Sequence, residues 1–286
     1  MKILKYFLEF IIISILFLIF KIIGYKFATY TGSLILTLCG PFFRSKKKIK
    51  SNIIRSLKNT DEKTAKKIAQ EMWSNYGRIL AEYVFIKNFR KSDFDKFLNI
   101  EGSEILEEIK RKNEPVIFIS GHFNNFELMA MQIEKSGINL AAIYRPLNNI
   151  FLNKIMEKIR KKYICKNQIK KGRAGTREVL SYFKKGHSIA LMIDQRVSEG
   201  IKSNFYGRPA FTTTIPAQLL KKFKCKIVPI YIERIDNINF RMVVNKPLIF
   251  NEDQTIEYIT QELNYWLEKM ISQKPGQWIW SHDRWK

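Results

Sequence analysis

The sequence predicts an α/β protein: a mixed, largely parallel β-sheet flanked by helices, preceded by an N-terminal transmembrane or interfacial helix. Short apolar runs bounded by turn residues alternate with amphipathic segments along most of the chain, a pattern typical of strands joined by helices. A long apolar segment lies near the N-terminus. With 286 residues, 46% of them hydrophobic, the chain is long enough to bury a substantial core.

The apolar segment Phe10–Phe20 contains one polar residue, Ser14. With its flanks from Tyr6 to Gly24 it is just long enough to cross a bilayer. Because no small-x-small cleavage site follows it, we expect an uncleaved anchor. Two lysines precede the segment, whereas eight basic residues follow it between positions 21 and 55. By the positive-inside rule, this asymmetry predicts that the body of the protein faces the cytoplasm.

The next stretch, Tyr25 to Phe43, is also apolar, but glycines interrupt it and a basic cluster follows it. This composition is typical of an interfacial segment or a re-entrant hairpin on anionic headgroups. A buried helix of the soluble body is the alternative. We therefore divide the chain into a membrane anchor and interfacial segment, residues 1–45, and a cytoplasmic domain, residues 46–286.

The body begins with the capping residues Thr60 and Asp61, which predict a helix or helix pair over Glu62–Ile86. The charged stretch Lys91–Leu98 is expected to form a loop. Further helices are predicted at Glu104–Lys112, Phe126–Lys135, Asn149–Lys162, Thr176–Lys185 and Glu257–Ile271. Strands are predicted at Val116–Ser120, Leu140–Tyr144, Ser188–Ile193, Lys226–Ile232 and Phe240–Val244.

The segment at positions 120–128, SGHFNNFEL, contains a histidine and a carboxylate directly after a predicted buried strand. On a straight helix, residues five positions apart point about 140° away from each other. His122 and Glu127 can therefore converge only if His122 lies in the turn and Glu127 in the first turns of the helix. A histidine oriented by a carboxylate at a strand end is a general-base arrangement. Taken alone, the pair is more typical of a loop histidine and an acid near a helix N-terminus.

Arg145 and Asp194 follow two further predicted strands, and Gln195 comes directly after Asp194. The carboxyl ends of parallel strands line the ligand crevice of such sheets. We therefore expect these side chains to lie near His122.

The charge and the cysteines restrict the classes of partner and site. Fifty Lys and Arg residues against 26 Asp and Glu give a formal net charge of +24, which suits nucleic acid, an anionic membrane surface or an acidic protein. Nucleic acid is disfavoured because no zinc-finger, helix-turn-helix or RNP-like pattern occurs. The three cysteines are far apart and form no CxxC, so we expect ordinary thiols, no disulfide framework and no metal site.

Several blocks together resemble the bacterial lipid A biosynthesis (lauroyl/myristoyl) acyltransferase family, within the superfamily that carries the HX4(D/E) motif. His122 and Glu127 match that motif. IYRPLNN at 143–149 resembles the family's arginine block, and LMIDQ at 191–195 its aspartate-glutamine block. NFYGRPA at 204–210 and PGQWIWSHDRW at 275–285 resemble two further blocks, so the resemblance covers essentially the full length. The chain departs from it at Asn124, where the family usually has glycine, and at Arg196, where many members carry an acid.

The resemblance implies a glycerolipid-acyltransferase-like fold and transfer of a fatty acyl chain to a hydroxyl of a lipid A precursor, at the inner membrane. It implies His122 as the general base and Glu127 as the carboxylate that holds the imidazole. Arg145 is expected to contact an oxyanion or phosphate, unless it forms a structural ion pair with Asp194. Asn149, Asp194 and Gln195 are expected to shape the substrate site.

No resident cofactor is expected, because the acyl chain arrives as a thioester on acyl-carrier protein or coenzyme A. The partners implied are this donor, a membrane lipid acceptor and an anionic membrane surface. A glycerol-phosphate or lysophospholipid acyltransferase is one alternative, and a non-catalytic, membrane-tethered basic binding protein is another. The oligomeric state, the acyl-chain length and the acceptor hydroxyl do not follow from the sequence.

Overall fold

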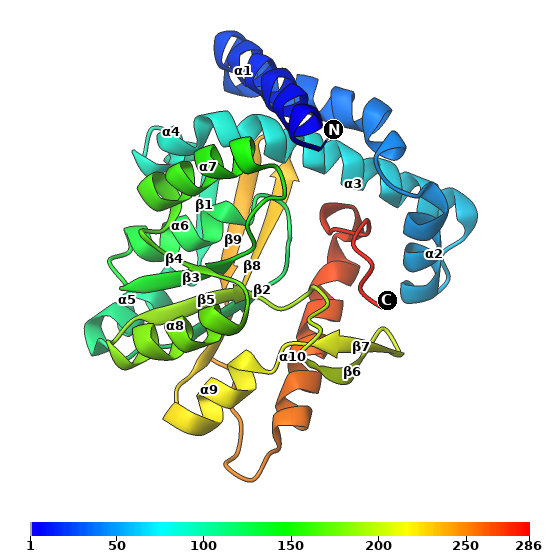
Figure 1. The fold of residues 1–286 in the computed structure, drawn as a ribbon. Coiled ribbons are helices and arrows are strands. Elements are labelled where there is room, and N and C mark those ends of the chain that lie inside the picture. Colours follow the sequence, from blue (N-terminus) through cyan, green and yellow to red (C-terminus); the bar gives the residue numbers. More distant parts are fainter. Residues whose placement is uncertain (1) are drawn as a thin grey trace.

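The structure, a computed structural model, describes residues 2–286 and contains a seven-stranded sheet in the order β1-β9-β8-β2-β5-β3-β4 (Figure 1). Neighbouring strands are parallel except for the antiparallel pair β8–β9. The strands are β1 (Leu98–Glu101), β2 (Ile117–Ser120), β3 (Leu140–Tyr144), β4 (Asn167–Lys170), β5 (Ser188–Met192), β8 (Ile227–Asp236) and β9 (Asn239–Val244). A separate antiparallel hairpin pairs β6 (Ile201–Phe205) with β7 (Arg208–Thr212).

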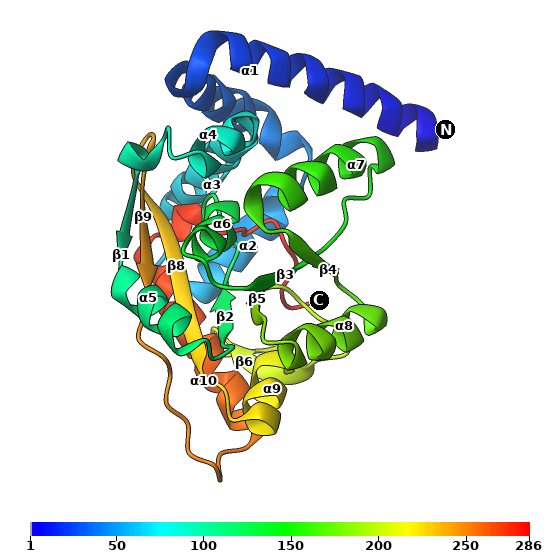
Figure 2. The same ribbon diagram turned by 90° about the vertical axis from the view of Figure 1, so that its left-hand side faces the viewer.

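Helices cover both faces of the sheet. In both ribbon views α6 and α7 lie on one side, and α8 and α9 lie on the other (Figures 1 and 2). The helices of the body are α2 (Lys46–Ser56), α3 (Glu62–Glu82), α4 (Ile86–Arg90), α5 (Ser103–Lys112), α6 (Glu127–Lys135), α7 (Ile150–Ile159), α8 (Arg173–Lys184), α9 (Ile215–Phe223) and α10 (Ile256–Gln273). This arrangement confirms the predicted mixed, mostly parallel sheet flanked by helices.

The central strand β2 is buried along its whole length, because helices cover both of its faces and strands pair with both of its edges. Its neighbours β5 and β8 run parallel to it. The loops that follow β2, β5 and β3 therefore meet at one edge of the sheet. This is the edge at which open α/β sheets hold their ligands.

The sequence did not predict every element. It missed β4, the β6–β7 hairpin, α2 and α9, and it assigned a loop to a stretch that ends in β1. Two of these strands have weak patterns, since β1 alternates half-buried with exposed positions and β4 buries one residue fully. Only pairing with a neighbouring strand makes such short polar segments extended.

Helix α1 (Lys2–Cys39) bends at Gly24, whose φ of 78° lies in the left-handed region. Residues 25–39 form one continuous helix after this bend, so the segment itself contains no hairpin. The helix is long and apolar enough to cross a membrane. Only 6% of its most apolar stretch is buried against the rest of the protein. It lies over the top of the molecule in Figures 1 and 2, with the part after Gly24 along α3.

The two helices approach so closely because each has a glycine at the crossing. A Cβ built on Gly77 of α3 would lie 1.8 Å from the carbonyl oxygen of Gly32 in α1. Beside this crossing, the hydroxyls of Ser33 and Ser74 form a hydrogen bond of 2.7 Å. Small residues of this kind let helix backbones touch.

Substitution of Gly77 by Ala should therefore destabilise the protein. The added methyl group has no room, and overpacking of this kind costs about 1–3 kcal/mol of unfolding free energy. Thermal unfolding in detergent measures the change, with Gln70→Ala on the exposed side of α3 as the matched control. Equal unfolding midpoints for the two variants would show that α1 and α3 can move apart without loss of stability.

Candidate active site

His122 and Asp194 lie at the ends of neighbouring parallel strands, in the loops that follow β2 and β5. The His122 Nδ1 atom lies 2.7 Å from Asp194 Oδ1. The backbone N–H of His122 donates to the other carboxylate oxygen, Oδ2, at 2.8 Å. The indole N–H of Trp278 donates to the same oxygen at 2.8 Å. Three nitrogen atoms thus surround one fully buried carboxylate.

This environment fixes the charge of Asp194 and the tautomer of His122. Burial alone would raise the pKa of Asp194, but the positive charge that His122 can carry and the hydrogen bonds from His122 and Trp278 lower it to about 2. An ionised carboxylate only accepts hydrogen bonds. The His122 proton therefore lies on Nδ1, and Nε2 has a free lone pair when the ring is neutral.

The free nitrogen of His122 faces a cavity. Its side chain is 21% exposed and lines the cavity wall. The Gln195 amide nitrogen lies 3.4 Å from Nε2. The Phe126 ring stands edge-on to the imidazole, with 4.8 Å between the ring centroids. A substrate hydroxyl in the cavity could approach Nε2 directly, so the histidine has the geometry of a general base.

Glu127 does not hold His122, contrary to the sequence-based expectation. Its Oε1 atom accepts hydrogen bonds from Arg160 Nε at 2.8 Å and Nη2 at 2.6 Å, and from the Tyr83 hydroxyl at 3.0 Å. Both members of the ion pair are almost fully buried. Burial alone would lower the pKa of Arg160, but Glu127 more than offsets this effect and raises it. The sequence pointed to Glu127 because it is near in the chain, whereas sheet pairing brings Asp194 nearer in space.

The cavity has a volume of about 990 Å³ and combines an apolar wall with a cationic rim. Such a lining suits a ligand with an apolar chain and an anionic group. Its apolar lining includes Phe126, Ala130, Ala142, Ile143, Ala190, Leu191, Met192, Val197, Ile215 and Ile279. Its cationic side chains are Arg44, Arg145, Arg160, Lys171 and Arg177.

Arg145 lies on this rim and is exposed. Among the side chains that the structure describes, it forms no ion pair within 4.0 Å, and the Asp194 carboxylate is occupied by His122 and Trp278. Desolvation and the nearby charge of Arg145 lower the pKa of Lys171. Two cations that repel each other at a cavity rim form a place where an anionic group is favoured.

Asn149 has a role that differs from the expected one. Its side-chain oxygen accepts hydrogen bonds from the backbone of Phe151 and Leu152 and so caps α7. Its amide nitrogen donates to the Tyr6 carbonyl at 2.8 Å and to Glu9 at 3.1 Å, both in α1. Asn149 joins α7 to the N-terminal helix and does not line the cavity.

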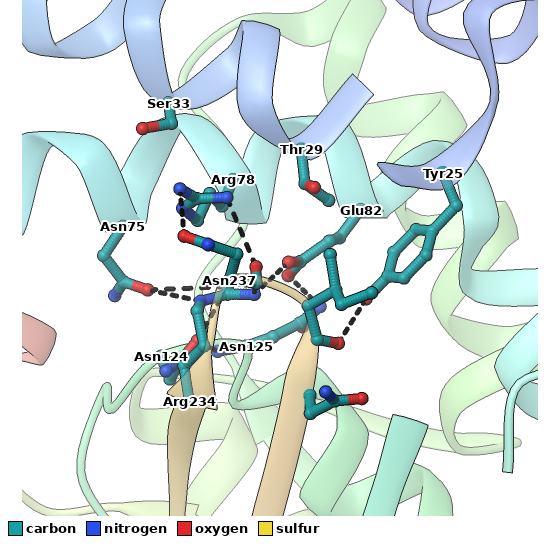
Figure 3. A network of polar contacts seen from close by, with 12 residues as sticks. Tyr25, Thr29, Ser33, Asn75, Arg78, Glu82, Asn124, Asn125, Arg234 and Asn237 are labelled. Carbon is teal, nitrogen blue, oxygen red and sulfur yellow. Dashed lines mark hydrogen bonds and ion pairs between the residues drawn. The ribbon is translucent and has the colours of Figure 1, made fainter. Parts of the chain in front are cut away.

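A buried polar network holds Asn124 and Asn125, which lie in the loop between His122 and Glu127 (Figure 3). Asn124, at φ 46°, accepts from Arg234 Nη2 at 2.9 Å and donates to the Gln277 side chain at 2.7 Å. Arg234 also pairs with Glu82 of α3 at 2.5 Å, and Asn125 donates to the second oxygen of Glu82 at 2.9 Å. The network thus connects the loop to α3, β8 and the C-terminal segment.

The C-terminal segment is part of this core. Trp278, Trp280 and Arg284 are almost completely buried, and Arg284 donates to the Phe211 carbonyl and the Thr212 hydroxyl at 2.6 Å each. Packing in the core therefore explains why tryptophans are frequent in this segment.

Cys165 and Cys225 lack the properties of nucleophiles. Burial raises the pKa values of the Cys165 and Cys225 thiols to about 12, which keeps both protonated. Within residues 2–286, no group of three or more His, Cys, Asp and Glu side chains is arranged to hold a metal ion.

Comparison with known proteins assigns the chain to a family. The sequence model described as "Bacterial lipid A biosynthesis acyltransferase" matches residues 1–286. The chain belongs to this family. It is 22% identical over 270 residues to the lipid A biosynthesis palmitoleoyltransferase of Escherichia coli (strain K12), covering 92% of this chain and 86% of the relative. The lipid A biosynthesis acyltransferase of Shigella flexneri gives the same values.

A third relative, the lipid A biosynthesis myristoyltransferase of Escherichia coli (strain K12), is 24% identical over 191 residues, 63% of this chain and 56% of that protein. The chain is therefore an acyltransferase, and its family implies a lipid acceptor and an acyl donor. Within this enzyme, the structure adds Trp278, Arg160 and Lys171 to the residues found from sequence. Arg160 begins the π-helical turn Arg160–Ile164 after α7 and is followed by two lysines, so no local pattern distinguished it.

Asn124 provides a test of the loop conformation. Asn124→Ala and Asn124→Gly lose the same side-chain hydrogen bonds, but only glycine adopts positive φ without cost. The alanine variant should be less stable than the glycine variant by about 1 kcal/mol. Chemical denaturation in detergent measures the difference, and an alanine variant as stable as the glycine variant would contradict the left-handed conformation.

His282 should make the protein sensitive to mild acid. Burial lowers its pKa from 6.5 to about 4, and its Nε2 accepts a hydrogen bond from the Arg196 backbone N–H at 3.1 Å. The unfolded chain therefore binds more protons than the folded protein between these pH values. Stability should fall as the pH drops from 6.5 to 4, by at most about 3 kcal/mol.

The measurement is the unfolding free energy at pH 7 and pH 4.5, for the natural protein and for His282→Gln, whose amide oxygen can replace the Nε2 acceptor. Asp194 does not contribute in this window, because its stabilising effect is lost only below pH 4. An equally steep loss of stability in His282→Gln would assign the effect to another group.

Proposed function

We propose that this acyltransferase moves a fatty acyl chain from a thioester donor, acyl-carrier protein or coenzyme A, to a hydroxyl of a lipid A precursor. The observation that carries the proposal is the His122–Asp194 pair, whose free nitrogen faces a cavity with an apolar wall and a cationic rim. The apolar wall suits the acyl chain, and the cations suit a phosphate of the donor or acceptor. The names of the relatives, which refer to lipid A biosynthesis, support this choice of acceptor.

In the proposed reaction, the acceptor hydroxyl gives its proton to His122 Nε2 while its oxygen attacks the thioester carbonyl carbon. The tetrahedral intermediate then expels the thiolate, which takes the proton from the imidazolium. Asp194 keeps Nδ1 protonated and stabilises the imidazolium as it forms. A positioned base of this kind contributes about 10²–10⁴-fold in rate.

The remaining groups bind and orient the substrates. Gln195 lies beside Nε2 and can donate a hydrogen bond to the acceptor oxygen as its charge develops. Arg145 and Lys171 bind a phosphate of donor or acceptor at the rim. Glu127 holds Arg160, which also lines the cavity, in place.

The membrane supplies the acceptor in this proposal. The part of α1 before Gly24 anchors the protein in the bacterial inner membrane, and the domain that follows faces the cytoplasm, where acyl thioesters are made. The net charge of +24 favours contact with anionic lipid and attracts an acidic carrier protein.

Substitution of His122 by Gln should lower the rate of acyl transfer by at least about 10²-fold, because Gln cannot accept the hydroxyl proton. Labelled acyl transfer to a lipid A precursor measures this rate, with acyl-carrier protein and coenzyme A thioesters as parallel donors. His187→Gln, a histidine outside the cavity lining, is the matched control.

Two outcomes would contradict the proposal. Near-normal turnover by folded His122→Gln would show that His122 is not the general base. Transfer to lysophosphatidic acid, with none to the lipid A precursor, would leave the acyl-transfer chemistry intact and reject the proposed acceptor.

A further inference from the structure

The part of α1 after Gly24 has its polarity inverted relative to a helix of a soluble protein. Its small and polar residues face the protein: Ala28 and Thr29 are fully buried and Ser33 is 9% exposed. Several of its large side chains face outward instead. They are Phe27 at 72% exposed, Tyr30 at 64%, Leu34 at 52% and Leu38 at 62%, followed by Phe42 at 82% and Phe43 at 68%.

Around Gly32 the inward face is held by close backbone packing, whereas at its start the Tyr25 ring packs against Phe85, Phe89, Phe94 and Phe97. Gly32 contacts Gly77 of α3 directly, and Ser33 bonds to Ser74. At the start of this half, the Tyr25 hydroxyl donates to the Ile238 carbonyl at 3.0 Å. Close contacts between small residues of this kind are typical of helices whose other face meets lipid. A surface helix of a soluble protein would instead have apolar residues on its inward face and polar residues on its outward face.

The charges that border this outward face have one sign. Lys26 lies at its beginning, and Arg44, Lys46 and Lys47 lie at its end, all of them exposed. The Lys46 ammonium lies 5.3 Å from the centre of the exposed Phe42 ring. Aromatic and leucine side chains bordered by cations complement a bilayer that presents anionic headgroups above an apolar interior.

The position of the cavity fits a membrane on this side. Both halves of α1 lie on the same side of the molecule (Figures 1 and 2). Arg44, directly after the exposed Phe42 and Phe43, lines the cavity. Leu147 and Asn148 line it too, and the next residue, Asn149, bonds to the first half of α1.

We propose that the outward face of residues 25–43 is a second membrane-contacting surface, which lies in the plane of an anionic phospholipid bilayer beside the anchoring first half. Its aromatic and leucine side chains enter the acyl-chain region, and the flanking cations contact lipid phosphates. This surface places the cavity rim at headgroup depth, so that a lipid can reach the site without leaving the bilayer. The proposal rests on the inverted polarity and does not depend on the acyl-transfer chemistry.

Depth-dependent fluorescence quenching tests it in the full chain. Cys39 is exposed, so a Cys39→Ser background serves as the labelling blank. Phe27→Cys, Leu34→Cys and Phe42→Cys in that background carry the environment-sensitive fluorophore NBD on the proposed surface. Ile15→Cys reports on the first half of α1. Ile249→Cys, an apolar residue 91% exposed between β9 and α10, is the matched control away from α1.

In vesicles of phosphatidylcholine and phosphatidylglycerol, NBD at positions 27, 34 and 42 should shift to the blue and be quenched by lipids brominated on the acyl chains. NBD at position 249 should show neither effect. Lys46→Gln/Lys47→Gln, or removal of phosphatidylglycerol, should weaken the quenching at position 42.

Emission at positions 27, 34 and 42 that resembles position 249 would overturn the proposal, even if position 15 is quenched. A blue shift without quenching by brominated lipid would overturn it as well, since a second copy of the chain would then cover the face. Loss of quenching at position 15 alone would contradict the proposed anchor and leave this surface standing. Acyl-transfer rates are measured separately, so failure of the proposed chemistry is distinguishable from failure of the proposed surface.

Discussion

The site depends on one buried carboxylate. Asp194 is inaccessible to solvent and accepts hydrogen bonds from the backbone and ring of His122 and from the indole of Trp278. A buried charge is costly unless such donors surround it. The same bonds that make the charge tolerable therefore fix the loop after β2, the tautomer of His122 and the position of the C-terminal segment. Because β2 and β5 are paired neighbours, the sheet itself sets this geometry.

Two further ion pairs hold the loop from other directions. Glu82 and Arg234 hold Asn124 and Asn125 at the base of the loop (Figure 3), and Arg160 and Tyr83 hold Glu127 where α6 begins. Each pair is buried, and each joins elements far apart in the chain. Their shared effect is to keep His122 between a fixed carboxylate and an open cavity. The HX4E spacing thus reflects two separate anchoring points on one loop.

Local patterns in the sequence predicted the architecture in outline and the position of His122 in the loop after β2. Alternating apolar runs predicted most strands, and the turn after β2 predicted where the histidine lies. The partner of the histidine could not be predicted this way, because the distance between Asp194 and His122 depends on which strands pair. The same limit applies to Asn149, whose side chain contacts α1, and to Arg160, whose role depends on helix packing. Short polar strands such as β4 also depend on their neighbours for their conformation.

The turnover number of Asp194→Asn, compared with that of Glu127→Gln in folded protein, tests the central claim most directly. An asparagine amide that donates to Nδ1 would move the histidine proton to Nε2, where it blocks acceptance of the hydroxyl proton. If Asp194 holds the base, its substitution lowers kcat by about 10³–10⁴-fold. Substitution of Glu127, which leaves Arg160 buried without a partner, mainly lowers stability, by about 3–5 kcal/mol. Near-normal turnover by Asp194→Asn, together with an inactive but fully stable Glu127→Gln, would contradict the account.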